Sequence, residues 1–209
     1  MYKRKSLFIV FEGIEGSGKS YQSLKLYKNV KKMGYPIVLL REPGGSRGAE
    51  IIRKIILSGK KNRFTTTTDT LLYLAARNEH LEKTLLPAIN KKKIVICDRF
   101  IDSTLAYQVY GQKVDISLVN SIHKKILGKT KPDFTFVLFV NLNKALFRIN
   151  KRKNKNRYDK YSKKFYDKIQ KVFVKIAKKN KRKYLILDNS KDDSKVEKII
   201  FKKILYLLN

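Results

Sequence analysis

The chain has 209 residues, a net charge of +32 at pH 7 and one cysteine, Cys97. This length suits a single α/β domain over residues 1–209, and no apolar stretch is long enough to cross a membrane. A lone cysteine excludes internal disulfides and a cysteine-based metal site, and it suits a cytoplasmic protein.

The predicted elements alternate along the chain. Residues 1–5 run directly into the first predicted strand, which leaves no room for a signal peptide. Apolar runs typical of buried strands lie at residues 7–11, 37–40, 94–97, 134–140 and 184–187. Helical patterns separate them, and the patterns at 161–179 and 196–207 predict core-facing helices. This alternation predicts βαβ units and a five-stranded parallel sheet, which is an α/β fold.

A glycine-rich loop follows the first strand in the pattern G-x-x-x-x-G-K-S. Glycines let backbone N–H groups surround a polyphosphate, and the next helix presents its positive dipole end. Lysine adds a charge at the β- and γ-phosphates, and the serine hydroxyl can bind the Mg²⁺ that accompanies ATP. The alternative is a glycine-rich turn with a solvated lysine. We predict an ATP site formed by Gly13, Ile14, Glu15, Gly16, Ser17, Gly18, Lys19 and Ser20.

Charged residues follow the other predicted strands. Arg41 follows the second, Asp98 and Arg99 end the third, and a basic segment at 148–157 follows the fourth. The carboxyl ends of parallel strands meet at one edge, where ligands bind. Asp98 is expected to hold Mg²⁺ through water, with a structural pair to Arg99 as the alternative.

The positive charge has two interpretations. It can mark a nucleic-acid surface, or it can reflect drift toward residues with A/T-rich codons, because lysines occur in nearly every predicted helix and loop. We expect no specific nucleic-acid partner. His80 and His123 have no ligand-like spacing and are assigned no chemistry.

From Phe8 to about Asp188 the chain resembles the bacterial thymidylate kinases. The motifs, in order, are F-E-G-I-E-G-S-G-K-S, R-E-P-G-G, L-Y-L-A-A-R, D-R-F-I-D-S-T-L-A-Y-Q and a basic lid at 148–160. The resemblance implies the three-layer P-loop NTPase fold, with a five-stranded parallel sheet flanked by helices. It also implies transfer of the γ-phosphoryl group of ATP to dTMP with Mg²⁺, giving dTDP, and a homodimer.

The resemblance assigns residues to the acceptor nucleotide. Tyr73 matches the aromatic ring that stacks on thymine, and Arg77 is expected to donate to a base carbonyl. Arg99 matches the arginine that binds the dTMP phosphate, and Arg41 lies close enough in the expected fold to share that role. Ser103 and Thr104 match positions that face the edge of the thymine ring, and Tyr107 matches the tyrosine under the deoxyribose. Gln108 follows Tyr107 as in many bacterial members. Glu15 matches the acid that contacts the 3′-hydroxyl or the water shell of the metal.

The resemblance also bears on the lid. Some members carry a catalytic arginine in the glycine loop, where this chain has Gly16. The charge on the transferring phosphoryl group must then come from the lid. Arg157 best matches the lid arginine of the family, and Arg152 and Arg148 are the other candidates.

Two other interpretations remain at this stage. The chain could be another P-loop kinase, acting on a deoxynucleoside or on a different nucleoside monophosphate. It could instead be a basic nucleic-acid-binding protein without catalytic activity, which its charge alone suggests.

Overall fold

Five parallel strands form the central sheet of the computed structural model, which describes residues 6–60, 62–153 and 156–208. Within these residues the strands are β1 (Leu7–Glu12), β2 (Ile37–Arg41), β3 (Ile94–Asp98), β4 (Phe134–Phe139) and β5 (Tyr184–Asp188). Their order is β2-β3-β1-β4-β5, and each neighbouring pair is parallel. The predicted α/β fold and its five-stranded parallel sheet are confirmed. The predicted approach of residues 1–5 to the first strand lies outside the described residues.

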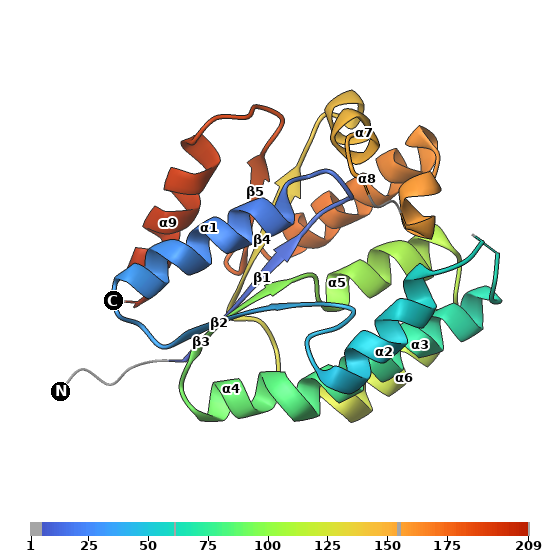
Figure 1. Ribbon diagram of the computed structural model, residues 1–209, viewed down its shortest axis with the longest axis horizontal. Coiled ribbons are helices and arrows are strands. Elements are labelled where there is room, and N and C mark those ends of the chain that lie inside the picture. The colour runs from blue at the N-terminus through green and yellow to red at the C-terminus, as the bar shows by residue number, and fades with distance from the viewer. Residues whose placement is uncertain (1–5, 61, 154–155, 209) are drawn as a thin grey trace.

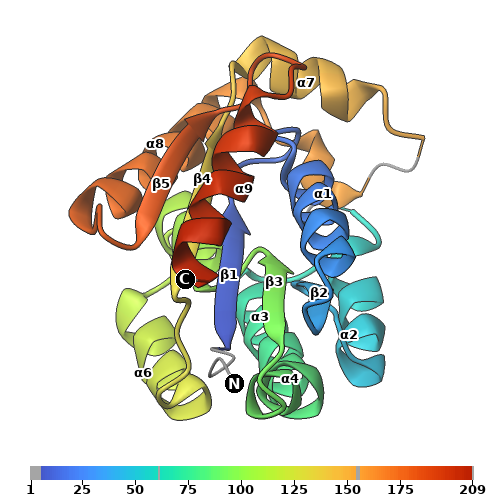
Figure 2. The ribbon, with the colours of Figure 1, turned by 90° about the vertical axis from the view of Figure 1, so that its left-hand side faces the viewer.

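Helices cover both faces of the sheet (Figure 1, Figure 2). The described α-helices are α1 (Lys19–Lys32), α2 (Arg47–Leu57), α3 (Thr66–His80), α4 (Leu86–Asn90), α5 (Ile101–Thr104), α6 (Ile116–Leu127), α7 (Leu142–Asn150), α8 (Lys163–Lys179) and α9 (Lys195–Leu208). Two π-helical segments, η1 (Leu81–Leu85) and η2 (Leu105–Gly111), and one 3-10 segment, η3 (Arg157–Lys160), are also present among the described residues. Among the described residues, no helix has the length and apolar character that a membrane span needs.

The central strand β1 is buried on both faces. Its first five side chains alternate between two apolar clusters, because successive residues of a strand point to opposite sides. Leu7, Ile9 and Phe11 pack with α1 and α9 on one face. Phe8 and Val10 pack with η1 and α4 on the other. The first predicted strand is apolar throughout for this reason.

The two predicted amphipathic helices form, with small differences. Helix α8 begins two residues later than the pattern at 161–179, because the side chain of Ser162 caps it by accepting from the Phe165 N–H at 3.2 Å. Ile169 and Phe173 of its apolar stripe are buried, as expected. In α9 the stripe is interrupted, since the side chain of Ile199 is 46% exposed.

The strand register brings the carboxyl ends of β1, β2 and β3 together. Phe11 pairs with Asp98 across β1 and β3, and Arg41 pairs with Asp98 across β2 and β3. The glycine loop after β1 therefore lies beside the charged residues that end β2 and β3. This is the edge at which the strand-end rule predicts a ligand site.

Removal of one core ring should show how much this packing contributes to stability. Phe136 is fully buried and stacks on Phe11 with ring centroids 5.3 Å apart. We expect Phe136→Ala to lower the free energy of unfolding by about 3–5 kcal/mol, measured by urea denaturation. Phe147→Ala is the control, because that ring is 52% exposed, and it should change stability by less than about 0.5 kcal/mol. Equal losses in the two variants would contradict the assignment of Phe136 to the core.

Candidate active site

The loop between β1 and α1 has backbone conformations and contacts that require glycine at two positions. Gly13 has a φ of 140°, and a Cβ atom there would lie 2.5 Å from the carbonyl oxygen of Leu138. Gly16 has a φ of 73°, and a Cβ atom there would lie 2.5 Å from the carbonyl oxygen of Ala145. A side chain at either position would clash with backbone and force an unfavourable φ. The loop therefore packs directly against the end of β4 and against α7.

The loop leads into the N-terminus of α1 without a capping side chain. Gly18 precedes the helix and, in the described structure, no side chain caps the first turn. The N–H groups of that turn can therefore bind an anion. The side chains of Ile14 and Ser17 are fully buried, so these two predicted loop residues can reach a ligand only through their backbone.

Lys19 is the buried cation of this loop. Its side chain is 6% exposed, and Nζ donates to the carbonyl oxygens of Gly13 at 2.9 Å and Ile14 at 2.8 Å. Burial, and then the nearby charge of Arg99, lower the pKa of Lys19 to about 8. An anion that approaches this ammonium group would oppose both effects and favour its charged form.

Ser20 and Asp98 lie together at the start of α1 and the end of β3. The Ser20 hydroxyl donates to Asp98 Oδ2 at 2.5 Å. A hydroxyl and one carboxylate beside a glycine-rich loop fit Mg²⁺, which keeps several waters and takes its other ligands from substrate phosphates. Among the described residues, no cluster of three or more His, Cys, Asp or Glu side chains forms a complete metal cage. The donor set therefore fits an ion that arrives with a nucleotide.

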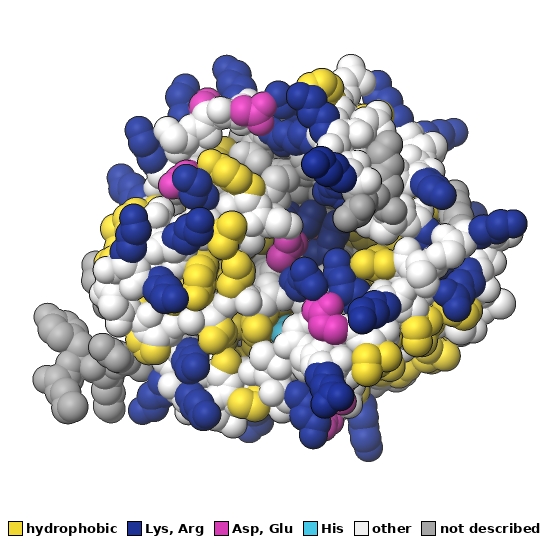
Figure 3. Space-filling model, in the orientation of Figure 1, with side chains coloured by type: hydrophobic (Ala, Val, Ile, Leu, Met, Phe, Trp, Pro, Cys, Tyr) yellow, Lys and Arg dark blue, Asp and Glu magenta, His cyan; other side chains and the backbone are white. Residues whose placement is uncertain are grey.

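A cavity opens beside these groups at the carboxyl edge of the sheet. Figure 3 shows this face of the molecule hollowed, with Lys and Arg side chains in the hollow. Among the residues that line the cavity are twelve predicted site residues: Glu15, Lys19, Ser20, Arg41, Tyr73, Arg77, Asp98, Arg99, Ser103, Thr104, Tyr107 and Gln108. The structure thus brings together positions that are as far apart in sequence as residues 15 and 108.

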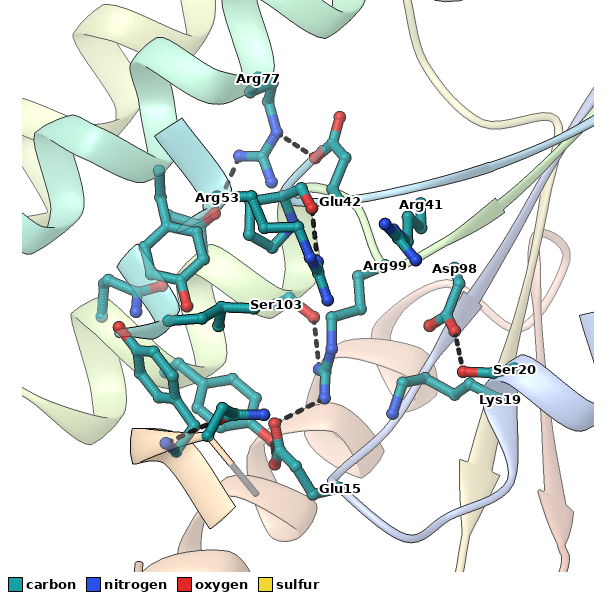
Figure 4. Close-up of a pocket in the computed structure, with 18 of the residues that line it drawn as sticks. Glu15, Lys19, Ser20, Arg41, Glu42, Arg53, Arg77, Asp98, Arg99 and Ser103 are labelled. Atoms are coloured by element: carbon teal, nitrogen blue, oxygen red, sulfur yellow. Dashed lines mark hydrogen bonds and ion pairs between the residues drawn. The ribbon is translucent and has the colours of Figure 1, made fainter. Parts of the chain in front are cut away.

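Arg99 lies in the middle of the cavity (Figure 4). One guanidinium nitrogen donates to the Gly13 carbonyl oxygen and to the Ser103 hydroxyl, each at 3.0 Å, and the other donates to Glu15 at 2.8 Å. Burial alone would lower the pKa of Arg99, but Glu15, Tyr107, Asp98 and Glu12 together outweigh burial and raise it. The hydroxyl of Tyr107 also donates to Glu15. Arg99 is therefore a fixed cation that links the glycine loop to the rest of the cavity.

Arg77 is held more tightly than its predicted role requires. It is 3% exposed, with Nε 2.7 Å from Glu42, Nη1 2.8 Å from the Thr104 hydroxyl and Nη2 2.9 Å from the Phe100 carbonyl oxygen. Nη1 also lies 2.7 Å from Nε2 of His123. Burial, and then Arg77, lower the pKa of His123 to about 3, so this imidazole is neutral. Most of the donor capacity of Arg77 is thus used inside the protein.

Tyr73 faces a second aromatic ring across the cavity wall. Its ring centroid lies 5.9 Å from that of Tyr158, in an edge-to-face arrangement, and both residues line the cavity. A flat base has the shape and apolar faces that such a wall can contact. Tyr158 was not among the predicted site residues.

The structure does not place Arg157 in the cavity, where the resemblance assigns the lid arginine. Its guanidinium is buried at 3% exposure, where it forms an ion pair with Asp69 and donates to the Ile56 carbonyl oxygen and the Tyr158 hydroxyl. The physical reason is that Asp69 is itself buried and requires a counter-charge.

The other two predicted lid arginines lie in different places. Arg152 lines the cavity and is 2.7 Å from the Asp159 carboxylate. Arg148 donates to the carbonyl oxygens of Gly16 at 3.0 Å and Asn189 at 2.9 Å. Positions 154 and 155 of the predicted lid lie outside the described residues.

Sequence reasoning missed several charged residues of the site. Arg53 lines the cavity from α2 and donates to the Pro43 carbonyl oxygen at 2.5 Å. Glu42 is 5% exposed between Arg77 and His80, whose Nδ1 is 3.0 Å away. The strand-end rule could have found Glu42, because it follows β2 directly. Arg53 could be assigned to the cavity only from the position of α2, and no local sequence pattern predicts that position.

Arg41 and Arg53 differ in how firmly they are held. Arg41 pairs with Glu50 at 3.0 Å, but its side chain is 56% exposed, so this pair is screened by solvent. Figure 4 shows Arg41, Arg53, Arg99 and Lys19 around one space. Four cations around a hollow form a site for an anion with several negative charges.

Comparison with known proteins gives one family. The model of the thymidylate kinase family matches residues 11–200. A thymidylate kinase of Wolbachia pipientis wMel is 41% identical over 202 residues, which cover 95% of this chain and 100% of that protein. A thymidylate kinase of Mycoplasma capricolum is 37% identical, with 95% and 96% covered. The crystal structure of thymidylate kinase from Ehrlichia chaffeensis has a TM-score of 0.77 and 32% identity, and covers 98% of this chain and 100% of that one.

The buried Glu42 gives a prediction about acid stability. Burial acts to raise the pKa of Glu42, but Arg77 and His80 outweigh it and lower that pKa below 4.5. The ionised carboxylate therefore stabilises the fold above about pH 4.5, and this contribution is lost as the pH falls through the lowered value. We expect Glu42→Gln to lower the free energy of unfolding at pH 7 by about 3–5 kcal/mol, and by less below about pH 4.

Urea denaturation at both pH values measures this difference. Glu82→Gln is the matched control, because Glu82 is exposed on η1, and it should change stability by less than about 0.5 kcal/mol. A Glu42→Gln deficit that is the same at both pH values would contradict an ionised Glu42.

Proposed function

The chain belongs to the thymidylate kinase family, and from this premise we propose how its cavity transfers the γ-phosphoryl group of ATP to dTMP, giving dTDP and ADP. The observation that carries the proposal is the arrangement of Lys19, Arg99 and Tyr73 around one cavity. Lys19 belongs to a phosphate-binding loop, Arg99 is a fixed cation beside it, and Tyr73 offers an aromatic face for a base. Donor phosphates and acceptor phosphate can thus meet within one enclosed site.

The donor site is the glycine loop with the start of α1. We propose that backbone N–H groups of residues 13–20 bind the β- and γ-phosphates of ATP, and that the Lys19 ammonium neutralises charge there. The carbonyl oxygens of Gly13 and Ile14 hold Nζ in place beforehand. Little reorganisation is then needed when the phosphates bind.

Ser20 and Asp98 are the residues that we propose hold Mg²⁺ with the ATP phosphates. Their oxygen atoms are already adjacent, at 2.5 Å. When bound there, Mg²⁺ would supply positive charge against the charge that develops on the β- and γ-phosphates. In the protein, Asp98 orients the Ser20 hydroxyl toward this position.

The acceptor site extends from Arg99 to Tyr73. We propose that Arg99 binds the dTMP phosphate, with Arg41 and Arg53 at the mouth of the cavity adding positive charge. The thymine ring stacks on Tyr73, with Tyr158 beside it. The Glu15 carboxylate, between Arg99 and Tyr107, is available to the deoxyribose 3′-hydroxyl or to the water shell of the metal.

Two residues from the sequence prediction complete the wall next to the base. Thr104 presents a hydroxyl that already accepts from Arg77, so its own hydrogen can be donated to a ring carbonyl of thymine. Gln108 is 2% exposed and also lines the cavity. We propose that Arg77 acts on the base chiefly by fixing Thr104.

Arg152 is the lid arginine that we propose stabilises the transferring phosphoryl group. It lines the cavity and is held by Asp159, whereas Arg157 is buried against Asp69. Gly16 provides no charge from the glycine loop, so an arginine from the lid must act in its place.

We further propose a cytoplasmic homodimer built from one domain with its lid at 148–160. Helices α2 and α3 pack on each other, and both carry exposed apolar side chains: Ile51 and Ile55 on α2 and Leu71 on α3. Ile51 and Ile55 are four residues apart and share a face of α2. This face is the one that we propose meets the second copy.

The function is tested by ADP release in the presence of ATP, Mg²⁺ and dTMP. We expect dTMP to be the best acceptor among dTMP, dUMP, thymidine, CMP and AMP, and chelation of Mg²⁺ to stop the reaction. Preference for another acceptor would make the chain a different P-loop kinase. Steeply salt-dependent RNA or DNA binding without any ADP release would instead favour a nucleic-acid-binding protein.

Lys19→Ala should lose most turnover. Removal of the ammonium group leaves phosphate charge unbalanced in the transition state, at a cost of about 3 kcal/mol or more in kcat/KM. The measurement is steady-state ADP release with dTMP. Lys164→Ala is the matched control, since Lys164 is exposed on α8, and its activity should equal that of the parent protein. Near-parental turnover of Lys19→Ala would refute the donor site.

Arg152→Ala should lower kcat about 100-fold or more while the Kd for dTMP stays nearly unchanged, because the lost charge acts on the transferring group. Stopped-flow ADP release and calorimetry measure the two quantities. Lys151→Ala is the control, because it removes an exposed neighbouring cation. A rise in KM without a fall in kcat would show that Arg152 binds substrate but does not assist transfer.

A further inference from the structure

Ser103 has a hydroxyl whose single hydrogen is already used inside the protein. It donates to Glu12 Oε2 at 2.6 Å, and its oxygen accepts from Arg99 Nη1 at 3.0 Å. The sequence led us to expect Ser103 at the edge of the thymine ring. In the structure its hydroxyl instead connects the cavity cation Arg99 to a carboxylate behind the cavity.

Glu12 is the carboxylate at the end of this connection. It is the last residue of β1 and is fully buried. While Oε2 accepts from the Ser103 hydroxyl, Oε1 accepts from the N–H groups of Phe100 at 2.8 Å and Ser103 at 3.2 Å. One buried side chain thus receives three hydrogen bonds from the segment that follows Arg99.

The backbone at Arg99 explains why that segment needs such a partner. Arg99 has a φ of 75°, a left-handed conformation that a residue with a side chain rarely adopts. Its N–H donates to the Phe11 carbonyl oxygen at 2.9 Å, so β1 holds the turn on one side. Glu12, the next residue of β1, holds the other side through Phe100 and Ser103. The direction of the Arg99 side chain therefore depends on the end of β1.

The ionisation of Glu12 depends in turn on the same residues. Burial, and then Asp102, raise the pKa of Glu12 to about 8, whereas Arg99, Ser103 and Phe100 act in the opposite direction. An ionised carboxylate can accept all three hydrogen bonds at once. An amide at this position has only one acceptor oxygen, so its NH2 group would face a donor on one side, either the Ser103 hydroxyl or the N–H groups of Phe100 and Ser103.

We propose that Glu12 and Ser103 are positioning residues that aim the Arg99 guanidinium at the phosphate of the acceptor, and that Ser103 does not recognise the base. This inference rests on the proposed role of Arg99 toward the dTMP phosphate. It gives different roles to two neighbouring residues of α5. Ser103 positions the arginine that binds the phosphate, and Thr104 contacts the base.

Thymidine and dTMP differ by the phosphate alone, so their relative affinities report on Arg99. In Ser103→Ala we expect the Kd for dTMP to rise about five- to tenfold, because one hydrogen bond that fixes Arg99 is lost. The Kd for thymidine should change less than about twofold. Calorimetry with each ligand, at one pH above about 8 where Glu12 is ionised, gives both values.

Three further variants make the test specific. Ser103→Thr keeps the hydroxyl and should restore the parental ratio of the two affinities. Glu12→Gln keeps the shape but replaces one of the two acceptor oxygens with an NH2 group, and should weaken dTMP selectively, as Ser103→Ala does. Thr104→Val is the matched control on the next residue, and should weaken both ligands by similar factors. Urea midpoints of all variants show whether each is folded.

Two results would overturn the inference. If Ser103→Ala weakens thymidine and dTMP equally, Ser103 contacts the base. If Ser103→Ala and Glu12→Gln both leave the ratio at the parental value, neither residue positions Arg99. Failure of the proposed function is a separate outcome. In that case the parent protein would bind dTMP no more tightly than thymidine, and so would Arg99→Met.

Discussion

The parallel pairing of β1 with β3 is the constraint on which the site depends. Because Phe11 lies opposite Asp98, the chain leaves both strands at the same level, and the glycine loop and Arg99 emerge side by side. A slip of one residue would turn every side chain of β1 to the other face of the sheet and remove its packing against α1 and α9. Burial of the apolar residues 7–11 of β1 therefore fixes where the glycine loop and Arg99 meet.

Carboxylates keep the cations in and beside the cavity at defined positions. Glu15 and Glu42 pair with the cavity residues Arg99 and Arg77, and Asp69 pairs with Arg157 behind the cavity wall. Removal of one member of such a pair leaves an uncompensated charge in the interior, which makes the pairs strong determinants of geometry. The many exposed lysines have no comparable constraint, since solvent screens them. The large net charge of this chain thus comes mostly from exposed lysines, whereas the geometry of the site depends on the paired arginines.

The fold and much of the site were predictable because their signals are local. An apolar run followed by G-x-x-x-x-G-K-S identifies a strand and the loop after it, and it places Lys19 at the end of that loop. Arg53 and Tyr158 gave no such signal, because their place in the cavity depends on how α2 and η3 pack. The burial of Arg157 gave no signal for the same reason, since an arginine among lysines looks solvated until its buried partner Asp69 is known. The hydroxyl of Ser103 could not be assigned from sequence, because its partners are Glu12 on β1 and Arg99 directly after β3.

The ion pair between Arg157 and Asp69 joins the lid region to helix α3 across 88 positions of sequence. If the segment around Arg157 were replaced by that of a relative, position 69 would have to be replaced as well to keep the ion pair. Lys153 and Lys160 are exposed nearby, and solvent screens them, so they are under no such requirement. The two ends of the pair must change together in this chain, because loss of either one removes the counter-charge of the other in the interior.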